Sequence, residues 1–280
     1  DTDAGTRDAP CVPSGTETCN GIDEDCDGRI DEDFDLAADL TNCGGCGYPG
    51  CRVLAEAIAN GTAPANTCVA GGNDVAKKLA ALMGAEVKDH RRMLAVALCK
   101  GGSKEAVKRA RYAGDMTCTA ANLTGGDKSC AYGCLGYGEC VDACKFDAMG
   151  MNANGLPVVF YDKCVGCGAC ARACPRDIIE MHPEEHKLFV YCRNKDKGAA
   201  SRKVCDVACI ACGLCVKDCS VPGGIALKDN LATVNYALAP QSDESTKRCP
   251  TKCIFSGIED QMTKSRFEAA ESHMADRKAV

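Results

Sequence analysis

The sequence predicts an α+β chain built from several small, cysteine-bound units rather than around one large apolar core. Cysteine supplies 25 of the 280 residues, about 9%, whereas aromatic residues make up only 5%. The run from Cys164 to Pro175 reads C-x2-C-x2-C-x3-C-P. Cysteine spacings after residue 129 also recur at an offset of 75 residues, which indicates two copies of one supersecondary unit.

The C-x2-C-x2-C-x3-C-P run is typical of iron–sulfur ligation. Three thiolates two residues apart on a glycine-bearing turn can bind three corners of one [4Fe-4S] cube, while the fourth, Cys174, reaches a second cube. The alternative is a disulfide knot, which this spacing followed by Pro disfavours. Each of the two copies should therefore be ferredoxin-like, with short strand pairs and one-turn helices around two cubes.

The first copy has two complete predicted ligand sets. One cluster is expected on Cys130, Cys134, Cys140 and Cys174. The other is expected on Cys144, Cys164, Cys167 and Cys170.

The second copy is degenerate. Ala239, Ser242 and Ser245 stand where the first copy has three cysteines, and alanine cannot bind iron. One cluster is expected to remain, on Cys209, Cys212, Cys215 and Cys249. Rescue of the lost cluster by Cys205, Cys219 or Cys253 stays open, although Cys253 is expected to be a small buried apolar side chain.

A separate four-cysteine motif precedes both copies, with the spacing C-x2-C-x4-C-x16-C. Two close thiolates, a third at the start of a helix and a fourth after it can enclose one [4Fe-4S] cube, and a structural zinc site is the second interpretation. The four predicted ligands are Cys43, Cys46, Cys51 and Cys68. The expected cluster total is therefore four.

Between these motifs the pattern predicts a small connecting segment. Helical spacing with a terminal glycine predicts a helix over 73–84, and weaker signals predict a strand over 93–98 and a helix over 103–112. Cys99 and Cys118 have no close cysteine partners and are expected to be structural thiols. His182 and His186 flank Pro183, so solvated surface is favoured over a metal pair.

The first 40 residues form a distinct acidic module, with 13 Asp and Glu against two Arg. Carboxylates at alternate positions suit Ca2+, and four of them have the spacing of a calcium loop. The candidate ligands are Asp23, Asp25, Asp27 and Asp31. Phe34 replaces the usual final glutamate, so an ordinary EF-hand is excluded and a solvated acidic loop remains open. The stretch 16–35 resembles a CNGIDxDCDG repeat of metal-binding modules in exported bacterial proteins.

Charge and motifs exclude several functions. The net charge is -6, and no basic stripe with interleaved aromatics is present, so nucleic acid is not an expected partner. No G-x-G-x-x-G follows a strand, which disfavours NAD or flavin binding, and no small-molecule substrate is expected. No run of about 18 apolar residues occurs. The first residue is Asp, so a leader or membrane anchor could have preceded it.

Six segments follow from these patterns. They are an acidic calcium-loop-like module (1–40), a single-cluster domain (41–70), a connecting segment (71–128), a two-cluster ferredoxin-like unit (129–192), a degenerate ferredoxin-like unit (193–258) and a charged tail (259–280).

Taken together, residues 42–256 resemble the B subunit of the Rnf electron-transport complex. The stretches NCGGCGYPGC, CAYGCLGYGEC, CVGCGACARACPRDIIE, CRNKDKG, CIACGLCVKDC and CPTKCI occur in order. The resemblance implies a role in carrying electrons from reduced ferredoxin along [4Fe-4S] clusters, within a membrane complex that pumps Na+ or H+ and reduces NAD elsewhere. It implies an electron-transfer subunit rather than a catalyst by itself.

Two departures from that family bear on the interpretation. The acidic module stands where the family has a membrane helix, and the fourth ferredoxin motif has lost ligands. The resemblance implies the cytoplasmic face of the membrane, with ferredoxin or other Rnf-type subunits as partners. The acidic module favours an alternative, an exported or cell-surface conduit that assembles with copies of itself. A calcium-binding, disulfide-rich structural protein is the third hypothesis.

Overall fold

The computed structural model describes residues 42–85, 91–238 and 244–256. The predicted calcium loop, the acidic module and the charged tail lie outside these residues. The helices are α1 (Cys51–Ala59), α2 (Gly72–Met83), α3 (Cys118–Thr124), α4 (Glu139–Asp142), α5 (Ala169–Arg172), α6 (Gly198–Val204), α7 (Leu214–Lys217) and α8 (Glu244–Lys247), with a 3-10 turn, η2 (Tyr236–Leu238). The strands are β1 (Met93–Ala97), β2 (Met149–Met151), β3 (Pro157–Val159), β4 (Ile179–Pro183), β5 (Leu188–Val190), β6 (Ile225–Lys228), β7 (Leu231–Val234) and β8 (Ile254–Ser256).

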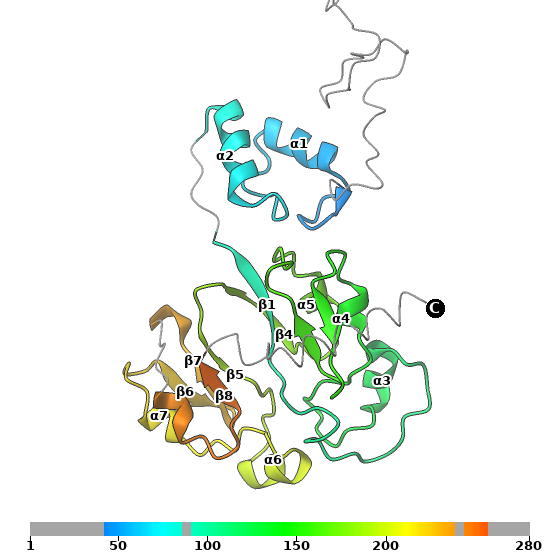
Figure 1. Cartoon of the computed structure of the whole chain (residues 1–280), viewed down its shortest axis with the longest axis vertical. Coiled ribbons are helices and arrows are strands. Elements are labelled where there is room, and N and C mark those ends of the chain that lie inside the picture. Colours follow the sequence, from blue (N-terminus) through cyan, green and yellow to red (C-terminus); the bar gives the residue numbers. More distant parts are fainter. Residues whose placement is uncertain (1–41, 86–90, 239–243, 257–280) are drawn as a thin grey trace, which may run out of the picture.

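Helices α1 and α2 form a small lobe at the top of Figure 1. Helix α1 begins at Cys51 and buries Leu54 and Ile58, four residues apart on one face. Helix α2 ends where Gly84 takes a left-handed conformation with φ of 62°, which glycine adopts without steric cost. A helix starting at the third cysteine of the first motif and a helix over 73–84 were both expected, and both predictions are confirmed.

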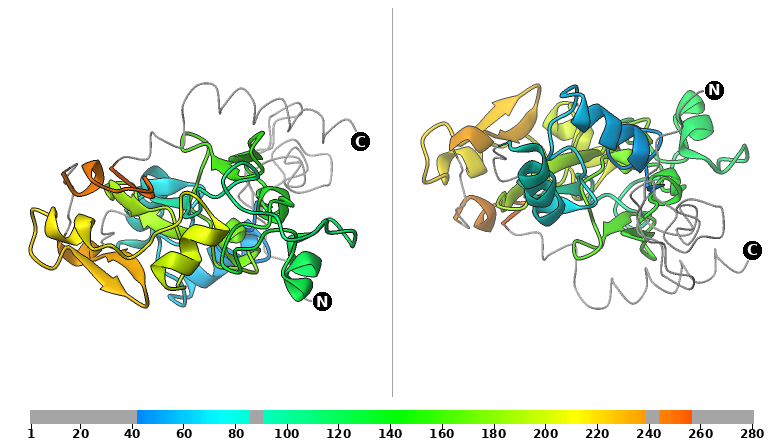
Figure 2. Two further views of the ribbon diagram at one scale, coloured as in Figure 1. Left: turned by 90° about the horizontal axis from the view of Figure 1, so that it is seen from below. Right: turned by 90° about the horizontal axis from the view of Figure 1, so that it is seen from above.

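The remaining strands form four antiparallel pairs with a repeated order. Strand β1 pairs with β4, and the β2–β3 hairpin lies between them in the sequence. Strand β5 pairs with β8 in the same way, and the β6–β7 hairpin lies between those two in the sequence. We call these elements the β1–β4 set and the β5–β8 set. Figure 1 and both views of Figure 2 place the two sets side by side, with α3 on the far side of the β1–β4 set.

The connecting segment confirms one local prediction and contradicts another. Strand β1 forms where the sequence predicted a strand, and its pairing with β4 attaches it to the β1–β4 set. The helix predicted over 103–112 is wrong, because this stretch is irregular. Its backbone makes bridges from Ala106 to Cys205 and from Lys108 to Lys128, and these tertiary contacts override a weak helical pattern.

Cysteines belong to the cores of both sets. In the β1–β4 set, Cys140 and Cys170 pack with Leu94 and Ile179. In the β5–β8 set, Cys209 and Cys215 pack with other apolar residues in the same way. Strands this short and four-residue helices bury little apolar surface, so the buried cysteines make up a large part of these cores.

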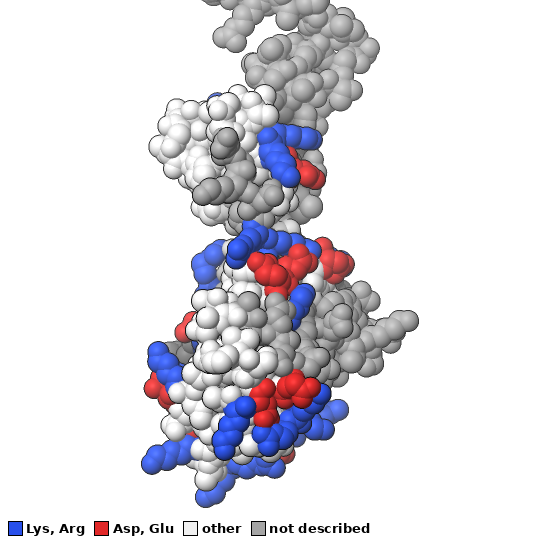
Figure 3. Space-filling model, turned by 90° about the vertical axis from the view of Figure 1, so that its left-hand side faces the viewer, with Lys and Arg blue, Asp and Glu red and all other residues white. Residues whose placement is uncertain are grey.

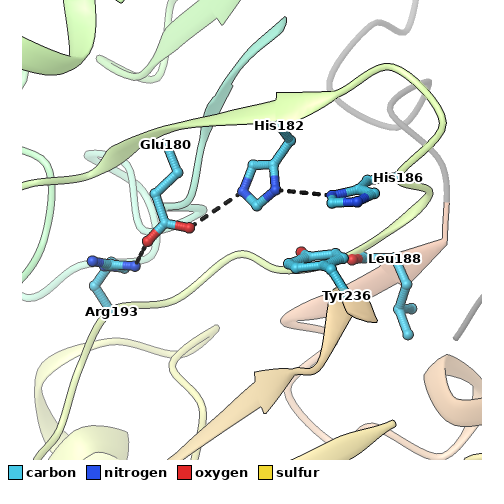
Figure 4. A network of polar contacts seen from close by, with 6 residues as sticks. All are labelled: Glu180, His182, His186, Leu188, Arg193 and Tyr236. Carbon is cyan, nitrogen blue, oxygen red and sulfur yellow. Dashed lines mark hydrogen bonds and ion pairs between the residues drawn. The ribbon is translucent and has the colours of Figure 1, made fainter. Parts of the chain in front are cut away.

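A polar and aromatic network joins the two sets (Figure 4). His182 on β4 is buried, with Nε2 3.2 Å from the Glu180 carboxylate and Nδ1 3.3 Å from Nδ1 of His186. His186 stacks on Tyr236, whose hydroxyl donates to the Leu188 carbonyl. The prediction that this pair is solvated surface is therefore wrong for His182. Aromatic packing from the second set covers it.

Charges of both signs share the face shown in Figure 3, and Lys and Arg border its lower end. None of the described helices has the length and apolarity needed to cross a membrane.

Candidate iron–sulfur sites

Every cysteine in the described part of the chain carries a free thiol. Most of these thiols gather in groups of four. We name the groups sites I to IV and the junction pocket.

Site II lies in the β1–β4 set and unites one predicted ligand set. Its pocket of about 310 Å³ is lined by Cys144, Cys164, Cys167 and Cys170. Gly166 and Gly168 have φ of 73° and 72°, so the loop turns tightly enough to aim successive cysteines inward. Burial, followed by the neighbouring thiols of Cys164, Cys167 and Cys144, raises the pKa of Cys170 to about 12.

Site IV lies in the β5–β8 set and also unites a predicted set. Its pocket of about 330 Å³ is lined by Cys209, Cys212, Cys215 and Cys249. Cys253 joins the same wall and is 3% exposed, with Sγ 3.8 Å from Sγ of Cys249. Its thiol hydrogen bond lowers the pKa of Cys249 to about 5. Its counterpart at the 75-residue offset, Ile178, lines site III.

Site III differs from the sequence prediction in one cysteine. Its pocket of about 390 Å³ is lined by Cys118, Cys134, Cys140 and Cys174, so Cys118 takes the place expected for Cys130. Thr117 caps α3 by accepting a hydrogen bond from the amide of Ala120, which fixes Cys118 at the first helical position. The C-x3-C spacing from Cys130 to Cys134 does not match the C-x2-C-x2-C pattern. This mismatch in the sequence already argued against placing Cys130 in the same site as Cys134.

Arg176 holds the loop beside site III. Its guanidinium donates to the carbonyl oxygens of Cys130, Gly133 and Gly125 at 3.0, 2.8 and 3.0 Å. It also donates to Oδ1 of Asn122 on α3 at 3.0 Å. One side chain therefore ties the cysteine loop to the helix that carries Cys118.

Site I lies in the α1–α2 lobe. Burial raises the pKa of Cys51, and the neighbouring thiols of Cys68, Cys43 and Cys46 raise it further, so the four predicted thiols lie near one another. The amide of Gly45 donates to Sγ of Cys43 at 3.4 Å. A Cβ on Gly45 would lie 3.3 Å from Cβ of Cys167, so the lobe docks its site I loop directly on site II.

The junction pocket was not predicted from the sequence. This pocket of about 350 Å³ is lined by Cys99, Cys130, Cys192 and Cys205. Cys99 was expected to be a structural thiol, Cys130 was assigned to site III, and Cys192 was given no role. Only the strand arrangement shows that Cys99 and Cys192 occupy equivalent positions, since Cys99 follows β1 by two residues and Cys192 follows β5 by two residues.

The degenerate position of the β5–β8 set shows no comparable group among the residues described there. Cys219 is half-buried, and its thiol donates to the Val221 carbonyl at 3.3 Å. Ser245 is fully buried, and its hydroxyl finds no hydrogen-bond partner in the described chain. Residues 239 and 242 lie outside the described part.

The donor sets of these sites are all thiol. In the described ranges, no three His, Cys, Asp or Glu side chains converge tightly enough to hold one metal ion. The cysteines surround pockets, and an all-thiol set spaced around a volume fits an iron–sulfur cube.

Consecutive sites are also neighbours in space. Site I abuts site II through Gly45, and sites II and III draw ligands from the ends of the packed helices α4 and α5. The amide of Cys134 in site III donates to Sγ of Cys99 at 3.4 Å. The amide of Cys209 in site IV donates to Sγ of Cys192 at 3.2 Å. The groups therefore form one continuous series.

Comparisons with known proteins agree with this arrangement. Residues 40–70 match a family described as an Fe-S cluster, and residues 157–180 match the 4Fe-4S binding domain. Residues 7–32 match a metal-binding motif family named for copper binding in MopE. The B subunit of the ion-translocating oxidoreductase complex of Methanosarcina acetivorans is 41% identical over 76% of this chain and 81% of its own length.

The chain belongs to the B-subunit family of the Rnf complexes. The B subunit of the proton-translocating ferredoxin:NAD(+) oxidoreductase complex of Clostridium ljungdahlii is 42% identical over 85% of this chain and 87% of its own length. The Na(+)-translocating counterpart of Acetobacterium woodii is also 42% identical, over 78% of this chain and 66% of its own length. The resemblance inferred from the motifs is confirmed, and the chain is an iron–sulfur electron-transfer protein of this family.

Proposed function

We propose that residues 42–256 relay single electrons through [4Fe-4S] clusters at sites I to IV, as the B subunit of a ferredoxin:NAD(+) oxidoreductase-type complex. The observation that carries the proposal is the contiguous series of all-cysteine pockets in a chain of this family. When bound, a [4Fe-4S] cluster supplies reversible one-electron chemistry without any acid or base.

The residues of the chain hold and tune these groups. Backbone amides donate to cysteine sulfurs in sites I and III, from Gly45 to Cys43 and from Ile178 to Cys174, each at 3.4 Å. Such hydrogen bonds stabilise the negative charge that a reduced cluster gains. Apolar walls of Met149, Ile179 and their neighbours limit water, which sets the potential further.

We infer that the two sets are tandem ferredoxin-like units and that the second has lost one cluster. The repeated strand pairing supports this division, with β1 belonging to the first unit and β5 to the second. The proposed units therefore begin near residue 91 and residue 187, earlier than the cysteine repeat alone indicated. The lobe carrying site I is the third unit.

The proposed partners are a ferredoxin-type donor and the other subunits of the complex, because the relatives are named as subunits of such complexes. The proposed setting is the cytoplasmic face of the membrane, by peripheral association. Anaerobic mixing with a reduced ferredoxin tests the relay. We expect rapid bleaching of the visible charge-transfer absorbance of the clusters. Iron-replete protein that no ferredoxin reduces would contradict it.

A second proposal concerns the acidic module alone. Carboxylate oxygens suit a hard cation such as Ca2+, and the family match over 7–32 supports metal binding there. Calorimetric titration of the full chain with Ca2+ and with Cu2+, beside an Asp25→Asn and Asp27→Asn variant, tests it. Equal heats for the two proteins would refute the proposed ligands.

A further inference from the structure

We propose that the junction pocket ligates a fifth [4Fe-4S] cluster through Cys99, Cys130, Cys192 and Cys205. The inference rests on the proposed relay for the identity of the cofactor. It adds a site between site III and site IV, and it gives a ligand role to four thiols that sites I to IV leave unused.

The pocket has the dimensions and donor set of the other sites. Its volume of about 350 Å³ lies between those of sites II and III, at about 310 and 390 Å³. Cys130, Cys192 and Cys205 are 7%, 8% and 6% exposed. Gly101 has no side chain, which lets the sulfur of Cys205 lie beside it. A Cβ at this position would be only 2.7 Å from Sγ of Cys205.

Hydrogen-bond donors already point at the sulfurs. The amides of Cys134 and Cys209 donate to Sγ of Cys99 and Cys192 at 3.4 and 3.2 Å. The side-chain amide of Asn194 donates to Sγ of Cys130 at 3.5 Å. Donors aimed at sulfur stabilise thiolates and cluster ligands far more than neutral thiols.

Asn194 is oriented for this contact. It is 1% exposed, and its Oδ1 accepts from the amide of Asp196 at 2.7 Å and from the hydroxyl of Ser201 at 3.2 Å. With Oδ1 engaged by two donors, the NH2 group must face the sulfur of Cys130. A buried amide fixed in this way prepares a site for an acceptor with negative charge.

A buried cation in the pocket wall supplies complementary charge. Lys128 is 5% exposed, and its ammonium group donates to the carbonyl oxygen of Gly101 at 3.3 Å. A neutral carbonyl does not balance a buried positive charge, which is costly without an anion nearby. A cube with four thiolate ligands carries net negative charge and would provide that anion.

Corresponding cysteines of the two sets line the pocket. Cys130 and Cys205 are equivalent at the 75-residue offset, and Cys99 and Cys192 each stand two residues beyond the first strand of their set. Each set therefore contributes one equivalent pair. A cluster here would lie beside site III through Cys134 and beside site IV through Cys209, and it would close the space between them.

Metal and sulfide analysis of the anaerobically purified full chain tests the proposal. We expect about 20 Fe per chain, and about 16 in a Cys192→Ala/Cys205→Ala variant, since each cube holds four Fe. Cys219→Ala is the matched control and should keep the wild-type iron. A double variant with unchanged iron, or one zinc per chain that this variant alone loses, would overturn the proposal. A wild-type chain without iron would instead refute the proposed relay as a whole.

A milder variant covers the case in which the double variant does not fold. Cys99→Ser keeps an oxygen ligand, so we expect one of the EPR signals of the reduced protein to change while the others persist. Lys128→Met should lower the reduction potential of that same signal, because it removes a nearby positive charge. EPR spectra and potentials that neither variant alters would contradict ligation at this pocket.

Discussion

The two four-strand sets share one strand plan but differ at one cluster position. In the β1–β4 set, Cys144 lines site II together with three cysteines from the segment before and within α5. In the β5–β8 set, the equivalent Cys219 donates to a backbone carbonyl, and Ser245 replaces a ligand. The strand pairing is the same in both. The same strand plan therefore forms whether or not four thiols gather at this position.

An ion pair stands near the lost position. Arg248 donates from Nε to the Asp218 carboxylate at 2.7 Å and makes a second bond to it, which links the end of α7 to the end of α8. The equivalent residues of the other set are Ala143 and Ala173. We infer that the pair replaces part of the connection that a cluster makes in the first set.

The largest predicted effect comes from equivalent cysteines in the two sets. Cys144→Ala should remove about four Fe and destabilise the chain, because it opens site II. Cys219→Ala should leave the iron content unchanged. Iron analysis and thermal unfolding followed by circular dichroism measure both. Equal iron losses in the two variants would show that Cys219 is a ligand after all.

A second comparison uses Arg176 and its equivalent Thr251. Arg176→Ala leaves several carbonyl oxygens without their donor and should cost about 1–3 kcal/mol of unfolding free energy. It should also loosen site III, seen as faster cluster loss under a chelator. Thr251→Val preserves volume and should cost less than half as much. A neutral Arg176→Ala variant would argue against its role in holding the loop.

The Arg248–Asp218 pair should contribute modestly. The Arg248 side chain is 58% exposed, so solvent screens the pair and the coupling should be weak. A double-mutant cycle with Arg248→Gln and Asp218→Asn measures it, at low salt and again at high salt. Coupling that salt does not weaken would contradict an exposed ion pair.

The smallest predicted effect is pH dependence between the sets. Burial, followed by the neighbouring His182, lowers the pKa of His186 below 6.5. The unfolded chain therefore binds this proton more readily, so stability is present above pH 6.5 and falls as the pH drops below it. Thermal midpoints between about pH 5.5 and 7.5 should fall less steeply in His186→Gln. Parallel curves would exclude His186 as the cause.

Sequence reasoning recovered the parts of the molecule that local spacing encodes. The thiols of sites I, II and IV follow C-x2-C patterns within one or two segments, and the structure brings them together as expected. Cys118 and Cys99 were predicted to be structural thiols, because the cysteines that share their pockets are distant in sequence and no periodic pattern links them. Strand pairing of β1 with β4, whose residues Ala97 and Ile179 face each other from distant parts of the chain, decides where both lie.

The junction pocket needs cysteines from both sets. Its two halves are equivalent, and each set supplies one pair of thiols. A single set standing alone would carry half of a binding site and could complete it only against a second copy. The tandem arrangement of the two sets therefore completes the pocket within one chain.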